Sequence, residues 1–119
     1  FRLGTQVRNV STTDPGTSAI SATLSVPLGI VVQANIIASI YGNGGTPSFM
    51  LVTALSQTNT TPSNSAFSVT VSNSDSEPVA PLLVPTNTSG QIRYRLSASS
   101  GSIIVRIQTI GWTDTRGRV

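Results

Sequence analysis

Apolar and polar residues alternate strictly through several short segments of this chain. The clearest segment is 91–98, which runs Gln-Ile-Arg-Tyr-Arg-Leu-Ser-Ala, and similar alternation occurs over 20–28 and 67–71. Successive side chains of a β-strand point to opposite faces, so this period of two predicts half-buried antiparallel strands. No segment shows a clear helical period. The pattern restricts the chain to an all-β fold.

Turn-forming residues divide the chain about every ten residues, as in many β-domains. Asp14-Pro15-Gly16 and the Gly42–Gly45 segment carry turn residues, and 99–102 is predicted to close a hairpin. At 119 residues the chain is predicted to be a single domain, 1–119. We expect an antiparallel, jelly-roll-like β-sandwich of about eight strands. The predicted strands are 2–10, 19–27, 30–41, 48–57, 66–72, 79–84, 91–98 and 102–112.

Two predicted strands carry apolar residues on both faces. They are 30–41, which includes Ile36 and Ile37, and the segment 103–107. A strand that is apolar on both faces must be covered on both faces, which favours a subunit interface over one of them. The alternative is a central strand covered by a loop of the same chain. All seven basic residues are Arg, a side chain suited to bidentate pairing across interfaces, so the interface candidates also include Arg93, Arg95 and Arg106.

The composition excludes most catalytic chemistry. The chain has no Cys, His or Lys, so it lacks an imidazole base, a thiolate and soft metal ligands. Its only acids are Asp14, Asp75, Glu77 and Asp114. Asp75 and Glu77 could contribute to a calcium site, but the other ligands are missing and a solvated loop explains them better. We therefore expect no enzyme activity, no metal and no cofactor.

The same composition restricts the partners. The net charge is +3, and the arginines are few and separated, unlike the dense basic patches that bind nucleic acid. No apolar run is long enough to span a bilayer, so membrane insertion is not expected. More than a quarter of the residues are Ser or Thr, which is typical of exposed virion or extracellular β-domains. A surface that binds or assembles is the expected role.

Contact residues for a ligand or receptor are predicted in the loops and among the few aromatic residues. Tyr41 lies beside the glycine turn, and Trp112 opens the C-terminal stretch, where an indole beside Arg and Asp could stack on a sugar. The alternative for Trp112 is a structural plug of the core or an interface anchor. Asn43, Asn59 and Asn64 complete the candidates, because side-chain amides can bond to hydroxyl groups.

The C-terminal sequence Gly111-Trp112-Thr113-Asp114-Thr115-Arg116-Gly117-Arg118 resembles the close of structural proteins of tailed bacteriophages. The resemblance implies a knob or head domain of a tail fibre or spike, at the C-terminal end of a longer chain and exposed on the virion. It further implies a homotrimer that attaches to the host surface by binding a bacterial glycan or protein. Two alternatives stay open: a purely structural virion or trimerisation module, and a lectin-like module of a cellular protein.

Overall fold

The computed structural model describes residues 2–41, 48–63, 65–71, 78–97 and 103–114, and this part of the chain contains eight strands and no helix. Each predicted strand has a counterpart, although β2 is much shorter than expected and β3 starts three residues later. The strands are β1 (Arg2–Thr13), β2 (Ile20–Thr23), β3 (Gln33–Tyr41), β4 (Ser48–Thr53), β5 (Val69–Val71), β6 (Val79–Pro85), β7 (Gln91–Leu96) and β8 (Ile104–Thr113).

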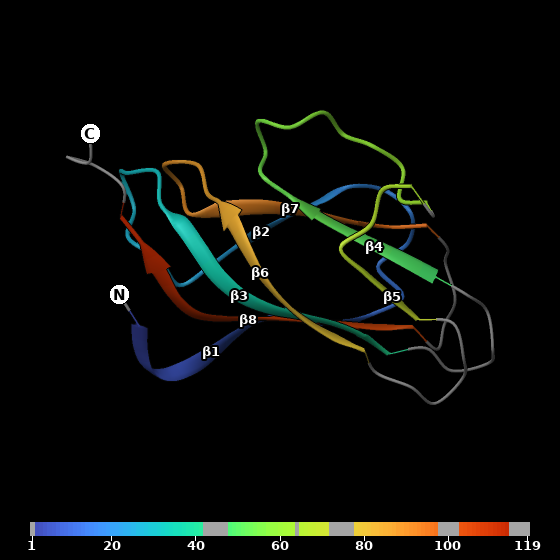
Figure 1. Ribbon diagram of the computed structural model, residues 1–119, viewed down its shortest axis with the longest axis horizontal. Helices are drawn as coiled ribbons and strands as arrows, with labels where there is room; N and C mark the ends of the chain where they lie inside the picture. The colour runs from blue at the N-terminus through green and yellow to red at the C-terminus, as the bar shows by residue number, and fades with distance from the viewer. Residues whose placement is uncertain (1, 42–47, 64, 72–77, 98–102, 115–119) are drawn as a thin grey trace.

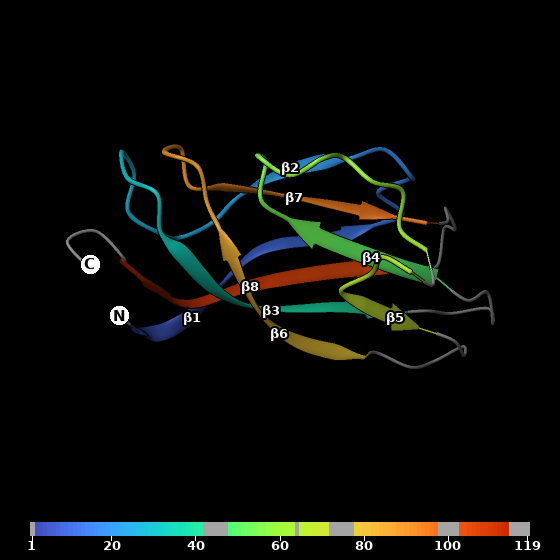
Figure 2. The same ribbon diagram turned by 45° about the horizontal axis from the view of Figure 1, so that its top comes forward.

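The strands form two four-stranded antiparallel sheets that pack face to face (Figure 1). Sheet A has the order β1-β8-β3-β6, and sheet B has the order β2-β7-β4-β5. The pairing is nested, because β1 pairs with β8, β2 with β7, β3 with β6 and β4 with β5. Figure 2 shows the same two sheets after a turn about the horizontal axis that brings the top of the Figure 1 view forward. The predicted all-β antiparallel sandwich is confirmed.

The inner faces of the two sheets form one hydrophobic core. On β3, the side chains of Ala34, Ile36, Ala38 and Ile40 are completely buried, as the period of two requires. The burial of Tyr94 in this core raises the pKa of its hydroxyl group. The remaining core residues are Ala22, Leu24, Met50, Val52, Val84, Ile92, Leu96, Ile103, Val105 and Ile107.

A buried threonine connects β1, β8 and the segment that follows β2. Thr109 is completely buried, and its hydroxyl donates a hydrogen bond to Oδ1 of Asn9. The same hydroxyl accepts a bond from the amide of Ser25 at 3.3 Å, and Nδ2 of Asn9 donates to Oγ of Ser25 at 3.0 Å. Because Ser25 follows a strand of sheet B, these bonds connect the two layers at one side of the sandwich.

We expect the substitution Thr109→Val to lower the free energy of unfolding by about 1–3 kcal/mol, the usual cost of leaving buried polar groups unpaired. Valine keeps the shape of the side chain but leaves the Asn9 oxygen and the Ser25 amide without this hydroxyl partner. Urea unfolding followed by tryptophan fluorescence measures the change. Thr23→Val, at an exposed position of β2, is the control. Its free energy of unfolding should stay within about 0.5 kcal/mol of that of the unsubstituted chain. Equal losses in both variants would contradict the prediction.

Candidate assembly face and binding hollow

The outer face of sheet A is apolar along one edge. On β6 the inner positions are Ala80, Leu82 and Val84, so the alternating positions point away from the core. The outward side chains are all apolar and exposed, with Val79 at 60% and Leu83 at 58% of their full exposure. The set consists of Val79, Pro81, Leu83 and Pro85.

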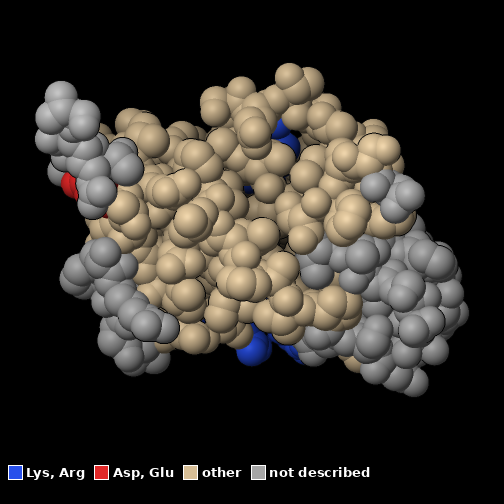
Figure 3. All heavy atoms as spheres, viewed as in Figure 1, with Lys and Arg blue, Asp and Glu red and all other residues tan. Residues whose placement is uncertain are grey.

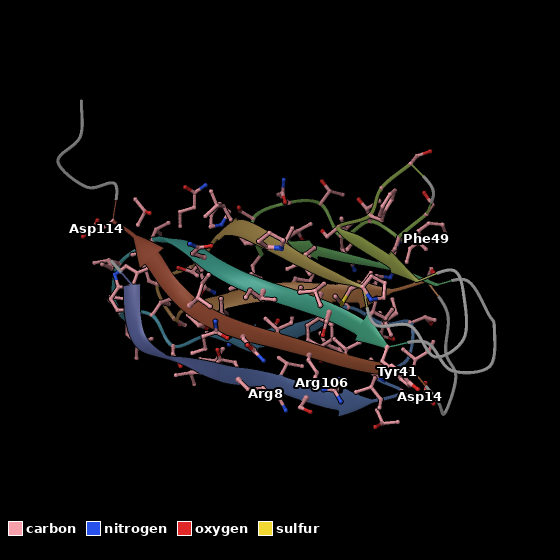
Figure 4. The ribbon with its side chains drawn as sticks, turned by 60° about the horizontal axis from the view of Figure 1, so that its bottom comes forward. Arg8, Asp14, Tyr41, Phe49, Arg106 and Asp114 are labelled. Carbon is pink, nitrogen blue, oxygen red and sulfur yellow. The ribbon has the colours of Figure 1, made fainter. Side chains whose placement is uncertain are left out.

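The strand register places these apolar residues in rows that continue across β3 and β8 to β1. Along each row the side chains become polar and basic toward β1. Directly paired residues of neighbouring strands lie on the same face of a sheet. One row runs through Pro81, Ile37, Gln108 and Arg8, and the next through Val79, Ser39, Arg106 and Ser11. Figure 4 shows Arg8 and Arg106 on adjacent strands of this face. A shallow hollow of about 360 Å³ is lined by Arg8, Ile37, Ser39, Val79, Arg106 and Gln108.

The exposed edge of β6 is poorly suited to pairing with another strand. β6 pairs with β3 on one side and is the last strand of sheet A. Pro81 and Pro85 have no amide hydrogen, and proline on an edge strand discourages the addition of a further strand. A molecule that docks here would therefore contact the side chains of the outer face and would not extend the sheet.

The structure places the two predicted interface isoleucines of β3 on opposite faces of sheet A. Ile36 is completely buried in the core and offers no surface to another chain, whereas Ile37 points outward and is half-buried. The segment 30–32 precedes β3, so the outer face of this strand is less apolar than expected. Most of the apolar outer surface comes from β6. In the sequence, Val79–Pro85 is an uninterrupted apolar run without alternation, but its position at the edge of sheet A appears only in the structure.

The arginines of β7 hold a loop of their own chain against sheet B. Arg93 donates from Nη1 to the carbonyl of Gln57 at 2.8 Å and from Nη2 to the carbonyl of Leu55 at 3.4 Å. Arg95 donates from Nε to the carbonyl of Thr17 at 2.9 Å and from Nη1 to Oδ1 of Asn59 at 3.2 Å. These side chains were predicted interface candidates, and the structure gives them contacts within the chain.

Between this loop and β4 lies a second hollow, of about 460 Å³, which we call the loop hollow. It is lined by Leu51, Thr53, Ser56, Gln57, Thr58, Thr60 and Ala66. Beside it, the ring of Phe67 packs on that of Phe49 at a centroid distance of 5.5 Å, and Phe67 is 45% exposed. Phe49 lies outside the core because β4 turns Met50 and Val52 inward, and Phe67 packs on its ring.

The two aromatic contact candidates lie at opposite ends of sheet A. Tyr41 ends β3, is half-buried, and lies near Asp14 in Figure 4. Trp112 pairs with the buried Ala34 after a bulge in β8, so the register places it on the core side of the sheet. It is half-buried there, a position that fits a structural plug at the end of the core better than an exposed platform.

The asparagine candidates are not brought together with the aromatic ones. Asn59 is exposed, and its side-chain oxygen accepts the bond from Arg95 at the rim of the loop hollow. Asn43 and Asn64 lie outside the described residues. Figure 3 shows basic side chains inside a hollow of one face of the molecule, whereas acidic side chains of the described residues are visible only at one end.

No protein-family model, curated protein or solved structure matches this chain. Within the described ranges, no three acidic side chains gather where they could hold a metal ion. The same ranges contain no helix long and apolar enough to cross a membrane.

We expect Arg93→Ala to loosen the segment 54–60, because the variant loses the two bonds to the carbonyls of Leu55 and Gln57. Since these bonds involve a charged donor that is partly exposed, the loss of stability should be about 1–2 kcal/mol. Hydrogen–deuterium exchange measured by mass spectrometry should show faster exchange in peptides that cover 54–60. Arg8→Ala, an exposed arginine of sheet A, is the matched control and should leave these peptides unchanged. Unaltered exchange in the Arg93 variant would mean that the guanidinium does not hold the loop.

Proposed function

We propose that this chain is a homotrimeric module of a phage tail that attaches the particle to the host surface. In this proposal the outer face of sheet A packs on other copies of the chain, and the rest of the surface stays available for the host. The exposed apolar row on β6 is the observation that carries the assembly, and the resemblance of the C-terminal sequence provides the link to phage tails.

The order of the strands supports a virion protein. Eight strands in two sheets, with the first half of the chain paired in nested order with the second half, are what a jelly roll requires. Jelly rolls occur in viral capsid and lectin domains, among others. A fold does not determine a function, and this strand order fits a virion domain and a lectin-like domain equally well.

The outer face of sheet A supports packing between copies. Val79 and Leu83 are large apolar side chains that are more than half exposed, and they lie in one row with two exposed prolines. Burying such a row against an apolar partner surface is favourable by about 25 cal/mol per Å². Edge prolines disfavour open-ended strand pairing, which fits a closed assembly made through side chains. The proposed number of three copies comes from the resemblance of the C-terminal sequence to tail-fibre knobs.

The surfaces outside sheet A support contact with the host. Sheet B has an outer face with a polar hollow and an exposed aromatic ring. Binding residues are disproportionately found on loops that a rigid scaffold positions, and the sandwich is such a scaffold.

We expect Leu83→Arg to disperse the trimer. Leu83 is 58% exposed in the single chain, so the variant should fold normally, while an unpaired charge in the assembled interface costs several kcal/mol. The dissociation constant should rise by at least about 100-fold. Light scattering coupled to size-exclusion chromatography measures the mass. The unsubstituted protein should have three times the 12.3 kDa of one chain, and the Leu83→Arg variant should have the mass of one chain.

The matched control for assembly is Thr23→Arg, which adds the same charge to an exposed position of sheet B. This variant should keep the mass of the trimer. A monomeric mass for the unsubstituted chain at micromolar concentration would refute the assembly proposal. So would a trimer that is unaffected by Leu83→Arg.

Attachment is tested by incubating the fluorescently labelled chain with a panel of intact bacterial strains. We expect binding to a subset of strains, and competition by the unlabelled chain for adsorption of phage particles that carry it. If no strain binds the chain and particles that lack it adsorb normally, attachment is excluded. The module would then be a structural part of the virion.

A further inference from the structure

We propose that the loop hollow on sheet B is a binding site for neutral saccharides. This inference rests on the proposed function, attachment to the host surface, and assigns that attachment to one site and one class of ligand. The volume of the hollow, about 460 Å³, lies in the range of small-ligand sites.

The polar groups that line the hollow are available to a ligand. The hydroxyls of Thr53, Ser56 and Thr58 and the side-chain amide of Gln57 take part in none of the hydrogen bonds found among the described residues. The hydroxyl of Thr60 donates to the carbonyl of Thr58 at 3.2 Å and can still accept. Hydroxyl and amide groups both donate and accept, which matches the hydroxyl groups of a sugar.

An aromatic surface lies next to these polar groups. Along β4 the outward positions are Phe49, Leu51 and Thr53, so apolar and polar contacts follow one another on a single strand. Phe67, which is adjacent to the lining residue Ala66, rests on Phe49 and remains 45% exposed. A sugar ring has an apolar face of C–H groups and a rim of hydroxyls, and this combination of ring and hydroxyls is complementary to it.

The hollow is formed before any ligand arrives. The side chain of Arg93 donates to the carbonyls of Leu55 and Gln57. The backbone N–H of Gln57 donates to the carbonyl of Ala54 at 3.1 Å. Ala66, which lines the hollow, exchanges two backbone hydrogen bonds with Ser63, of 3.0 and 3.1 Å. A site that is already ordered costs less conformational entropy on binding, which compensates for its shallow shape.

The charges around the hollow favour a neutral ligand. Anion sites are built from groups that only donate, such as guanidinium groups and backbone amides. No arginine among the described residues lines this hollow, and Arg93 and Arg95 direct donors to oxygen atoms of their own chain. A purely apolar ligand is also a poor match, because it would leave four polar side chains unpaired. Both considerations leave a polyhydroxylated neutral molecule as the best match.

The probes for the test are methyl glycosides of glucose, galactose, mannose and N-acetylglucosamine, added separately at millimolar concentration to the ¹⁵N-labelled 119-residue chain. We expect at least one glycoside to shift the amide resonances of residues 53–60 and 66–67. Glucuronic acid and inorganic phosphate are added in the same way as anionic ligands for comparison. No shift with any glycoside, shifts confined to other residues, or a stronger response to the anions would overturn the proposal.

Two variants test the site with folding monitored independently. Thr53→Val together with Thr58→Val removes two hydroxyls without changing side-chain volume and should weaken binding about tenfold. Ala66→Trp should abolish it by filling the hollow, while the backbone bonds to Ser63 remain. Thr23→Val, an exposed hydroxyl removed from the same face of sheet B, is the control and should bind normally. Unchanged binding by both site variants would overturn the assignment.

The same variants separate this inference from the proposed function. If the chain labels bacteria and Ala66→Trp does so equally well, attachment stands and the saccharide site in the loop hollow is wrong. If the glycosides bind in the hollow but no bacterium is labelled, the site stands and the attachment proposal fails. Loss of bacterial labelling in Ala66→Trp, with labelling retained in Thr23→Val, supports both.

Discussion

The burial of β3 between two neighbours is the constraint on which the rest of the structure depends. This strand pairs with β8 on one side and with β6 on the other, and four of its inner side chains are completely buried. Because the side-chain period of a strand is two, a slip of one residue would move these groups to the outer face. The hydrophobic effect therefore fixes the register of β3, and the pairing with its neighbours then determines which residues share each row of the outer face.

This register gives the two outer faces different characters. On sheet A it aligns Pro81 with Ile37 and Val79 with Ser39, so the apolar edge on β6 is continuous with the centre of the sheet. On sheet B, Arg93 and Arg95 point outward because Ile92, Tyr94 and Leu96 point inward. They hold a loop over the sheet, and the loop hollow results. We propose the first face for packing between copies and the second for binding a small polar ligand.

The inward and outward faces of a strand were predictable from the sequence where polar and apolar residues alternate strictly. The segment Gln91–Leu96 was assigned to the correct faces throughout, because polar and apolar residues alternate without exception. The sequence could not predict which of Ile36 and Ile37 faces the core, because two adjacent isoleucines give no alternation. Arg93 was predicted at an interface, whereas its side chain bonds backbone carbonyls 36 and 38 residues distant in the same chain, which no local pattern predicts.

The sequence by itself determined that the chain is a sandwich of about eight antiparallel strands, because local alternation and turn residues are short-range properties. It also determined the scarcity of catalytic groups, because composition does not depend on folding. Only the tertiary structure decided that β6 supplies the apolar outer edge and that the loop after β4 borders the loop hollow. Both features depend on which distant strands become neighbours, and that choice is made by the packing of the whole core.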